Sequence, residues 1–353
     1  MESEPEPETG MERCNFYSDT QTRPSRAMLE TVLTAEVGDE QSGRDPTTLA
    51  LCARVADLLG QEDAVFMPSG TICNEIAIAA HTRPGDEVIC HRLSHIITAE
   101  GGGPAAFSGV MMHMLDGERG MFTAEQVRGA LRSGSRYEPR SRLLSLENTM
   151  NFGGGAVWPL PQFSEVVGAA REGGLRVHLD GARLMNAAIA SGHSASAYGG
   201  LCDSVWLDFT KGLGAPVGAV LAGSRAFIDE AWRLKQRWGG AMRQSGILAA
   251  MCNYALDHNI DHLAEDHDLA RFIAAEVARM PGVAGVLPVE TNIVIFDLTG
   301  EAPAAATMVE RMAAHGVRIG ALGARRMRIV THLDVDRSQA QEMLTAFAQS
   351  LNG

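Results

Sequence analysis

Residues 205–218 read Val-Trp-Leu-Asp-Phe-Thr-Lys-Gly-Leu-Gly-Ala-Pro-Val-Gly. The apolar residues 205–207 predict a short buried strand, and the glycines and proline after Lys211 exclude a long helix or a regular strand. Lys211 is therefore expected at a strand end, on a tight turn with apolar neighbours. Most lysines are solvated surface charges, but a lysine screened from water in such a turn can act as a nucleophile toward a carbonyl group.

A second strand end lies upstream. Residues 175–180 alternate between apolar and polar and end at Asp180, which Gly181, Ala182 and Arg183 follow. A strand ending in aspartate and another ending in lysine form the layout that a pyridoxal phosphate (PLP) site requires. The aspartate pairs with the pyridinium nitrogen, and the lysine holds the aldehyde. A strand-end aspartate alone is common in α/β enzymes, so the pair carries the prediction that Asp180 and Lys211 are catalytic.

A third strand end offers a place for the phosphate. The apolar run 64–67 is followed by Pro68, Ser69, Gly70 and Thr71, and residues 72–80 predict a buried helix. A helix N-terminus presents free backbone N–H groups and the positive end of the helix dipole to an anion. We expect Ser69, Gly70 and Thr71 to hold the cofactor phosphate, with an ordinary helix cap as the alternative.

These strand ends belong to a longer series of motifs. The series is SDTQTRPSRAML (18–29), VGDEQSGRDPT (37–47), PSGT (68–71), LSHIITAEGGG (93–103), LLSLENT (143–149), HLDGARL (178–184), TKGLGAPVG (210–218), GGAMRQSGILAA (239–250) and RIVTHLDV (328–335). In order and spacing it resembles the low-specificity L-threonine aldolases, a family of fold-type-I PLP enzymes. The resemblance implies an α/β, transferase-like fold: a large domain around a mostly parallel sheet, and a smaller C-terminal α+β domain.

The resemblance also implies roles for single residues. His95 would stack on the cofactor ring and lie near the substrate side chain, where an imidazole offers a proton acceptor close to neutral pH. Arg183 and Arg328 would hold the substrate carboxylate, since an arginine fork binds it with two hydrogen bonds, and Ser18 would contribute. Arg243 would face the cofactor phosphate or a subunit contact.

Some positions depart from the family pattern. Tyr137 and Met150 stand where many members carry histidines near the substrate hydroxyl, Ser42 replaces a common tyrosine, and Arg44 replaces a common acid. Asp208 stands where an uncharged residue is usual. All but Asp208 are expected on the substrate side. We therefore predict that Tyr137 is a substrate-binding residue, that the preferred substrate is bulkier or charged, and that L-threonine is a poor one.

The predicted reaction follows from these assignments. A β-hydroxy-α-amino acid would undergo retro-aldol cleavage to glycine and an aldehyde, which makes the protein a PLP-dependent carbon–carbon lyase. The same residues suit β-elimination, racemization or transfer of a glycyl group to an aldehyde, and these remain alternatives. A PLP-fold protein without activity is disfavoured, because Lys211, Asp180 and Arg183 are all present.

Composition limits the partners. The chain has 353 residues, is 45% hydrophobic and carries a formal net charge of −13, which argues against nucleic acid or an anionic membrane as a partner. No apolar run reaches the roughly 18 residues of a membrane span, and the acidic N-terminus lacks the apolar core of a signal peptide. The six scattered cysteines predict buried thiols in a reducing cytoplasm and no metal site.

Local patterns divide the chain into a disordered segment (1–14), a large PLP-binding domain (15–255) and a small C-terminal domain (256–353). Strands are predicted at 64–67, 87–90, 110–114, 142–146, 176–179, 204–208 and 219–222, alternating with helices. The small domain is predicted to contain strands at 291–297 and 327–331 and helices ending at 279, 314 and 351. By resemblance the polar loop 37–46 lies near a neighbouring subunit's active site, which implies a homo-oligomer, either a dimer or a tetramer.

Overall fold

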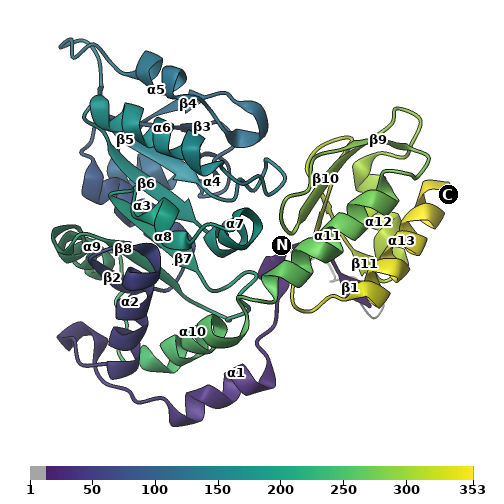
Figure 1. The fold of residues 1–353 in the computed structure, drawn as a ribbon, viewed down its shortest axis with the longest axis horizontal. Coiled ribbons are helices and arrows are strands. Elements are labelled where there is room, and N and C mark those ends of the chain that lie inside the picture. The colour runs from purple at the N-terminus through teal and green to yellow at the C-terminus, as the bar shows by residue number, and fades with distance from the viewer. Residues whose placement is uncertain (1–12, 353) are drawn as a thin grey trace, which may run out of the picture. The chain divides into compact units, whose positions relative to one another are not determined.

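The computed structural model describes residues 13–352. The chain forms two units: a large one, Thr22–Ala264, and a small one made of the residues up to Gln21 and those from Glu265 onward (Figure 1). The predicted boundary at 255 falls inside helix α10 (Gly246–His258), which belongs to the large unit. Phe16, predicted in the large domain, is buried in the core of the small unit, and its N–H donates to the carbonyl of Arg318 at 2.8 Å.

The predicted disordered segment covers residues 1–14. Residues 1–12 lie outside the described residues. Cys14 is ordered, because strand β1 (Cys14–Asn15) pairs in parallel with strand β11 (Val317–Arg318) of the small unit.

A seven-stranded sheet organises the large unit, in the order β2-β8-β7-β6-β5-β3-β4. Only β8 runs against its neighbours, so the sheet is mostly parallel, as predicted. All seven strands predicted in this part of the sequence are present. They are β2 (Asp63–Met67), β3 (Asp86–His91), β4 (Met111–Leu115), β5 (Arg140–Glu147), β6 (Arg176–Gly181), β7 (Ser204–Asp208) and β8 (Ala219–Gly223).

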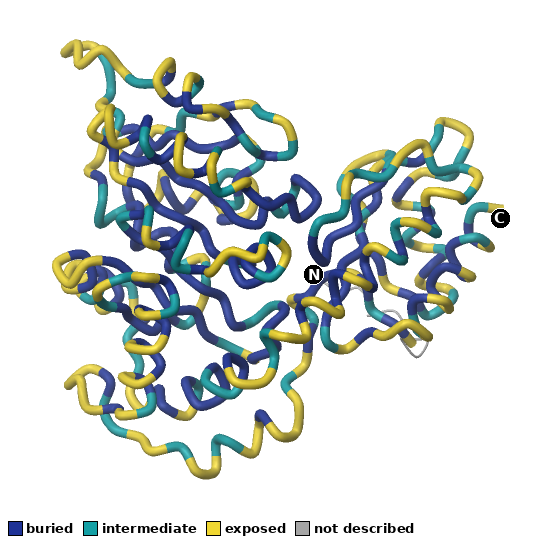
Figure 2. Tube along the Cα trace, viewed as in Figure 1, coloured by how far each residue is buried: buried dark blue, intermediate teal, exposed yellow. Residues whose placement is uncertain are grey.

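Helices cover both faces of this sheet, which Figure 2 shows as a buried layer. One face packs against α2 (Pro46–Leu59), α5 (Ala124–Ala130), α6 (Leu160–Glu172), α7 (Leu184–Ser191), α8 (Ala195–Gly199) and α10. The other face packs against α3 (Gly70–His81) and α9 (Arg225–Arg237). The strands alternate accordingly: Val205 and Leu207 of β7 face the first cluster, and Trp206 faces the second.

Short helices complete the large unit. Ser25 caps α1 (Arg26–Glu30) as predicted, since its side chain accepts a hydrogen bond from the N–H of Met28. The predicted helix 25–34 continues only as a 3-10 helix, Thr31–Thr34. Helix α2 ends at Gly60, whose φ of 68° places it in the left-handed region that favours glycine at a helix end.

The small unit packs helices on an antiparallel sheet. Its strand order is β12 (Gly320–Ala321), β13 (Arg326–Val330), β10 (Ile293–Leu298) and β9 (Val283–Val286). Helices α12 (Ala305–Ala314) and α13 (Arg337–Asn352) contribute to its core, as does α11 (Leu263–Val277), which begins in the large unit. The predicted α+β character is therefore present.

A buried ion pair fixes the polar loop 37–46. Glu40 lies in the 3-10 helix Glu40–Ser42, and its carboxylate contacts the ammonium of Lys235 on α9. The Lys235 side chain is fully buried, and that of Glu40 is 2% exposed. Burial lowers the pKa of Lys235, while the charge of Glu40 opposes this shift. The other carboxylate oxygen of Glu40 accepts a hydrogen bond from the N–H of Met242 at 2.7 Å.

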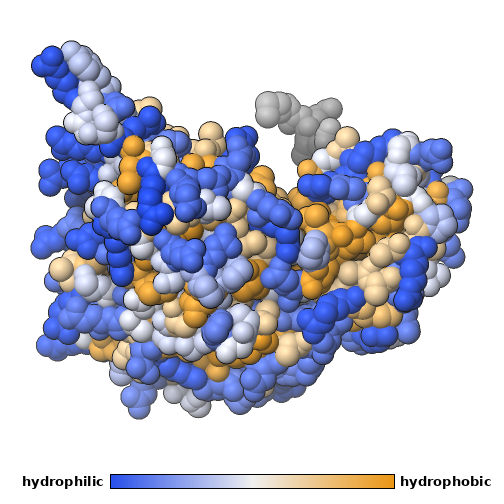
Figure 3. All heavy atoms as spheres, turned by 45° about the horizontal axis from the view of Figure 1, so that its top comes forward, coloured by the Kyte–Doolittle hydropathy of each residue, from blue (hydrophilic) through white to orange (hydrophobic). Residues whose placement is uncertain are grey.

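The surface is polar with small apolar patches. Hydrophilic side chains dominate the face of the large unit that Figure 3 shows, with hydrophobic ones between them. Within residues 13–352, no helix has both the length and the apolar character that a bilayer crossing requires. All six cysteines are buried.

Candidate active site

The carboxyl ends of three neighbouring strands bring acidic residues to one edge of the sheet. Glu147 ends β5, Asp180 is the penultimate residue of β6, and Asp208 ends β7. The strands are parallel, and the register pairs Asp180 with Glu147 on one side and with Trp206 on the other. Because the carboxyl ends of strands in an open α/β sheet form its ligand-binding edge, this is where a site is expected.

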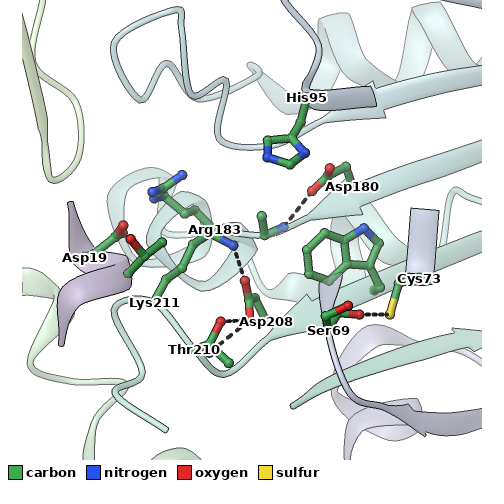
Figure 4. A network of polar contacts seen from close by, with 12 residues as sticks. Asp19, Ser69, Cys73, His95, Asp180, Arg183, Asp208, Thr210 and Lys211 are labelled. Carbon is green, nitrogen blue, oxygen red and sulfur yellow. Dashed lines mark hydrogen bonds and ion pairs between the residues drawn. The ribbon is translucent and has the colours of Figure 1, made fainter. Parts of the chain in front are cut away.

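Lys211 lies on the turn after β7, as predicted. Its side chain is 19% exposed and pairs with the carboxylate of Asp208, which is 2% exposed. The other oxygen of Asp208 accepts hydrogen bonds from the N–H and hydroxyl of Thr210, at 2.9 and 2.8 Å. These bonds hold the turn. The Lys211 amine is therefore held by Asp208, one of the positions at which the sequence departs from the family pattern (Figure 4).

Asp180 is buried and hydrogen-bonded. One oxygen accepts from the N–H of Ala182 at 3.0 Å, and the other accepts from the side-chain amide of Asn74 on α3 at 2.8 Å. Burial raises the pKa of Asp180, although the charge of His95 and the bond from Asn74 oppose this. A nearby cation would therefore stabilise the ionised form of the Asp180 carboxylate.

His95 begins helix α4 (His95–Thr98), after β3. Its backbone N–H donates to Glu147 at 2.8 Å, and its Nδ1 lies 2.7 Å from an oxygen of Glu100. The imidazole is 36% exposed and lies close to Asp180 (Figure 4). One ligand-type atom each from His95, Glu100 and Asp180 lies within 4.8 Å of the others. The structure therefore brings His95 and Asp180 together, as predicted.

Ser69, Gly70 and Thr71 form the start of α3. Ser69 is its N-cap, with its hydroxyl 3.5 Å from the N–H of Ile72. A Cβ on Gly70 would lie 2.2 Å from the indole ring of Trp206, so only glycine fits there. The first N–H groups of this helix of 12 residues point out of its N-terminus, and Ser69 and Thr71 are exposed.

The predicted carboxylate-binding residues belong to different units. Arg183 is the buried N-cap residue of α7 in the large unit, and its guanidinium lies 3.5 Å from the side-chain oxygen of Asn151. Ser18 and Arg328 lie in the small unit, Ser18 buried and Arg328 half-buried on β13.

The neighbours of Arg328 have structural partners. Arg325 donates to the carbonyls of Thr299 and Gly300, and Arg326 forms a two-bond pair with Asp297 at 2.7 and 2.8 Å. The motif RIVTHLDV, rather than these contacts, selects Arg328 as the member of the cluster to consider for a substrate carboxylate.

Tyr137 does not join the site within its own chain. It is 83% exposed and precedes β5, whereas the site lies where β5 ends. A strand of 8 residues separates the two ends, about 26 Å at the usual rise per residue. The structure therefore does not bring Tyr137 to the site of its own chain, and its role at the substrate stays a prediction.

Met150 differs from expectation. Met150 is 1% exposed and packs where a Cβ on Gly120 would collide with it, so it lines no open pocket. Arg243 pairs with Asp39 at 3.3 Å and is 64% exposed. This contact ties Arg243 to loop 37–46 of its own chain, and both expected roles, contact with the phosphate or with another subunit, stay predictions.

The sequence analysis missed three site residues. Asn74 and Glu100 surround Asp180 and His95, and Glu147 holds the backbone of His95. Burial, followed by the charge of Asp180, raises the pKa of Glu147 to about 7. Glu147 could have been found by the strand-end criterion that identified Asp180. Asn74 could have been found because it lies one helical turn after Gly70, on the same face.

Comparisons with known proteins agree with this geometry. Residues 15–301 match the family model described as beta-eliminating lyase. The chain is 42% identical over 330 residues to the low specificity L-threonine aldolase of Escherichia coli strain K12, covering 93% of this chain and 96% of that protein. It is 36% identical over 347 residues to low-specificity L-threonine aldolase 1 of Arabidopsis thaliana, covering 97% of each.

Solved structures match the fold. The threonine aldolase of Leishmania major superposes with a TM-score of 0.80 at 21% identity, over 96% of this chain and 99% of that one. A serine palmitoyltransferase of Sphingomonas wittichii gives 0.72 at 15% identity, over 95% and 86%. The matches in sequence identify the chain as a member of the low-specificity L-threonine aldolase family within the beta-eliminating lyases.

Proposed function

We propose that the protein is a PLP-dependent aldolase that cleaves a threonine-like β-hydroxy-α-amino acid to glycine and an aldehyde. One observation carries this proposal: Lys211 and Asp180 lie at the carboxyl ends of adjacent parallel strands, with His95 beside Asp180. Relatives named as threonine aldolases over nearly the whole chain support it.

The residues present fit pyridoxal phosphate. Lys211 supplies the amine that holds the aldehyde, and the start of α3 supplies N–H groups and hydroxyls for the phosphate. Gly70 is required where that helix meets Trp206. Asp180 is a buried carboxylate with a raised pKa, and a protonated ring nitrogen would provide the positive charge that it lacks.

The side chains then have distinct tasks. The cofactor supplies an electron sink for the bond that breaks at Cα. Arg183 would bind the substrate carboxylate, which orients the Cα–Cβ bond. His95 would accept the proton of the β-hydroxyl group, and Lys211 would hold the cofactor.

The substrate is threonine-like. The preference for a bulkier or charged side chain depended on Tyr137 and Met150, and that for an anionic side chain also on Arg44. Within its own chain Tyr137 lies at the opposite end of β5 from the site, and Met150 is buried. The relatives named as threonine aldolases favour threonine, and Arg44 is the reason to include an acidic substrate among those tested.

The decisive experiment measures several products together. The PLP-loaded protein is incubated with threonine, allo-threonine, an aromatic and an acidic β-hydroxy-α-amino acid, and glycine, aldehyde, ammonia and chirality are measured. We expect glycine and aldehyde in equal amounts with threonine or allo-threonine. Ammonia with a keto acid would identify β-elimination, and loss of chirality without cleavage would identify racemization.

Lys211→Ala tests the central assignment. We expect turnover and the visible absorbance of the lysine-bound cofactor to be lost, because no other described residue takes the place of this amine at the turn after β7. Circular dichroism should be unchanged, since the side chain is outside the core. Full aldolase activity in this variant would contradict the proposal.

The protein is also proposed to act as a homo-oligomer in the cytoplasm. The family resemblance and the polar loop 37–46 support an active site completed by a neighbouring copy. The burial of all six cysteines supports a reducing compartment.

A further inference from the structure

Behind His95 lies a network of polar side chains to which the reaction above assigns no role. The amide oxygen of Asn74 accepts a hydrogen bond from the indole N–H of Trp206 at 2.8 Å. Because indole is a donor only, this contact fixes the orientation of the amide, and Nδ2 is the donor on its other side. That Nδ2 donates to Glu100 at 2.7 Å and to Asp180 at 2.8 Å. Glu100 therefore receives one fixed donor from Asn74 and lies 2.7 Å from Nδ1 of His95.

A second carboxyl group lies behind Glu100. Glu75 on α3 is 2% exposed, and among the described residues neither of its oxygens has a hydrogen-bond partner; Oε2 of Glu100 also lacks one. A Cβ on Gly103 would lie 1.9 Å from Oε1 of Glu75, so this carboxyl group is enclosed by backbone.

Glu75 is the protonated member of this pair. Two adjacent buried carboxylates cannot both be ionised at low cost. Glu100 has a fixed donor, whereas Glu75 has none, so the charge belongs on Glu100. Burial, followed by the charge of Glu100, raises the pKa of Glu75 to about 8. Protonated Glu75 can donate to Glu100, which completes the set of donors around that carboxylate.

We propose that Glu100 is the positioning residue of His95: its carboxylate, kept ionised by Asn74 and protonated Glu75, holds the proton on Nδ1 and leaves Nε2 as the base. An ionised carboxylate has no proton to give, so the hydrogen in the 2.7 Å contact belongs to Nδ1. A neutral imidazole has one N–H group, and the lone pair is then on Nε2.

This assignment rests on the proposed function and specifies how its base works. The β-hydroxyl proton passes to Nε2 of His95, the O–H electron pair becomes the second bond of the aldehyde carbonyl, and the Cα–Cβ pair stays on the Cα side. The Glu100 carboxylate stabilises the imidazolium that results, as the buried acid of a catalytic triad does.

The charges around His95 favour this role. Glu100 follows α4, Asp180 lies on β6, and Glu147 at the end of β5 accepts the backbone N–H of His95. Burial alone lowers the pKa of His95, but the hydrogen bond to Glu100 and the charge of Asp180 outweigh it and raise the pKa. Figure 4 also draws two cations, Arg183 and Lys211, and both belong to elements other than α4.

The first test uses the wild-type holoenzyme. Nitrogen NMR of the protein labelled at its 11 histidines gives the protonation state of each ring nitrogen, and His95→Gln identifies the signals of His95. Above the pH at which His95 titrates, we expect a protonated Nδ1 and an unprotonated Nε2. The opposite tautomer would overturn the proposal even if the enzyme is a normal aldolase. If no amino acid is cleaved, the proposed function fails, and this spectrum still decides the position of the proton.

The second test is Glu100→Gln. A glutamine can present its own N–H to Nδ1 and so allow the wrong tautomer. We expect kcat/KM to fall by about 10²–10⁴-fold. The acidic limb of its pH profile should move to lower pH, because His95 loses a neighbour that raises its pKa. A reduced rate with an unmoved limb and unmoved His95 signals would overturn the proposal.

Glu87→Gln is the matched control. Glu87 on β3 is a buried carboxylate 3.3 Å from Nδ1 of His113, and it lies in the same sheet but near the amino end of its strand. This variant should leave the tautomer of His95 and the pH limb in place. An equal shift in this variant would mean that loss of any buried carboxylate has the effect, which contradicts a specific role of Glu100.

Discussion

Asp180 shows how a single residue can combine structural and chemical tasks. It is buried, accepts bonds from Ala182 and Asn74, and lies beside His95. Asp180→Asn should still bind PLP, because the shape of the site is kept. We expect kcat to fall by about 10²-fold or more, since the neutral amide no longer stabilises a protonated ring nitrogen. Turnover is measured together with cofactor absorbance, so that loading and chemistry are separated.

Asp203→Asn provides the control for that variant. Asp203 pairs with Arg176 at 2.7 Å, next to the amino ends of β6 and β7. An aspartate-to-asparagine change at the amino ends of these strands should leave kcat within a small factor of the wild-type value. An unchanged kcat in PLP-loaded Asp180→Asn would show that Asp180 is not the ring partner.

Glu75 should make stability depend on pH. Its pKa is about 8 in the folded chain, against 4.5 for a free side chain, so folding keeps a proton that the unfolded chain releases. The contribution of Glu75 to stability is complete below about pH 4.5 and is lost as pH rises toward 8. Glu75→Gln removes this dependence. We expect the Tm of Glu75→Gln minus the Tm of the wild type to increase between pH 5 and pH 8, because the wild type loses the contribution of Glu75 over this range. A Tm difference that stays constant with pH would contradict a protonated Glu75.

Strand ends indicated part of the candidate site. Lys211 and Asp180 were inferred from such ends and His95 from the family resemblance, and the structure brings Asp180 and His95 together at the edge from which the Lys211 turn leaves the sheet. Tyr137 and Met150 were inferred from motif positions alone. A motif position does not indicate which end of a strand faces the site, or whether a side chain is covered. Glu75 and Glu100 gave no signal, because their pairing joins a helix to a distant turn.

At the scale of elements, the Glu40–Lys235 pair decides how loop 37–46 attaches to α9. Glu40→Ala leaves a lysine that is 0% exposed without its counter-charge. We expect a loss of about 3–5 kcal/mol in the free energy of unfolding, measured by denaturant titration. The surface pair Arg26–Glu30, with side chains 92% and 57% exposed, is the control. Glu30→Ala should cost less than about 1 kcal/mol, and equal losses would refute the importance of burial.

The elements themselves were largely predictable. Each strand of the large sheet is a short apolar run between turn residues, and all seven were found because buried strands require such runs. The small unit was harder. Strand β9 has a mixed burial pattern without a fully buried residue, and β1, β11 and β12 have two residues each, too few for a period. The place of Phe16 depends on a contact with a segment some 300 residues away in the sequence, which no local pattern contains.

At the scale of the whole molecule, exposed apolar side chains provide a candidate surface for the second copy of the proposed homo-oligomer. Leu29, Leu33, Val37, Leu49 and Ile247 are 39–84% exposed, and they lie on α1, the following 3-10 helix and loop, α2 and α10. Helix α10 contacts α1, α2 and this 3-10 helix, so most of these positions belong to one neighbourhood. We expect light scattering to give a multiple of the 37.7 kDa chain mass.

Leu33→Glu tests this interface. Leu33 is 84% exposed, so a glutamate there is harmless in an isolated chain but unfavourable in an apolar contact. The variant should shift to a smaller species and lose activity with it. Met114→Glu, at a residue 48% exposed on the opposite edge of the sheet, should keep the wild-type mass. A fully active wild-type monomer would refute the oligomer.

The six cysteines have a practical consequence for handling the protein. They are distributed over both units, all buried. Burial raises the pKa of Cys52 and of Cys90 to about 12, which keeps these thiols in their unreactive form. A thiol-specific dye therefore reports how often each unit opens. The labelling rate of Cys14 measures the opening of the small unit, and the labelling rates of the other five cysteines measure that of the large unit.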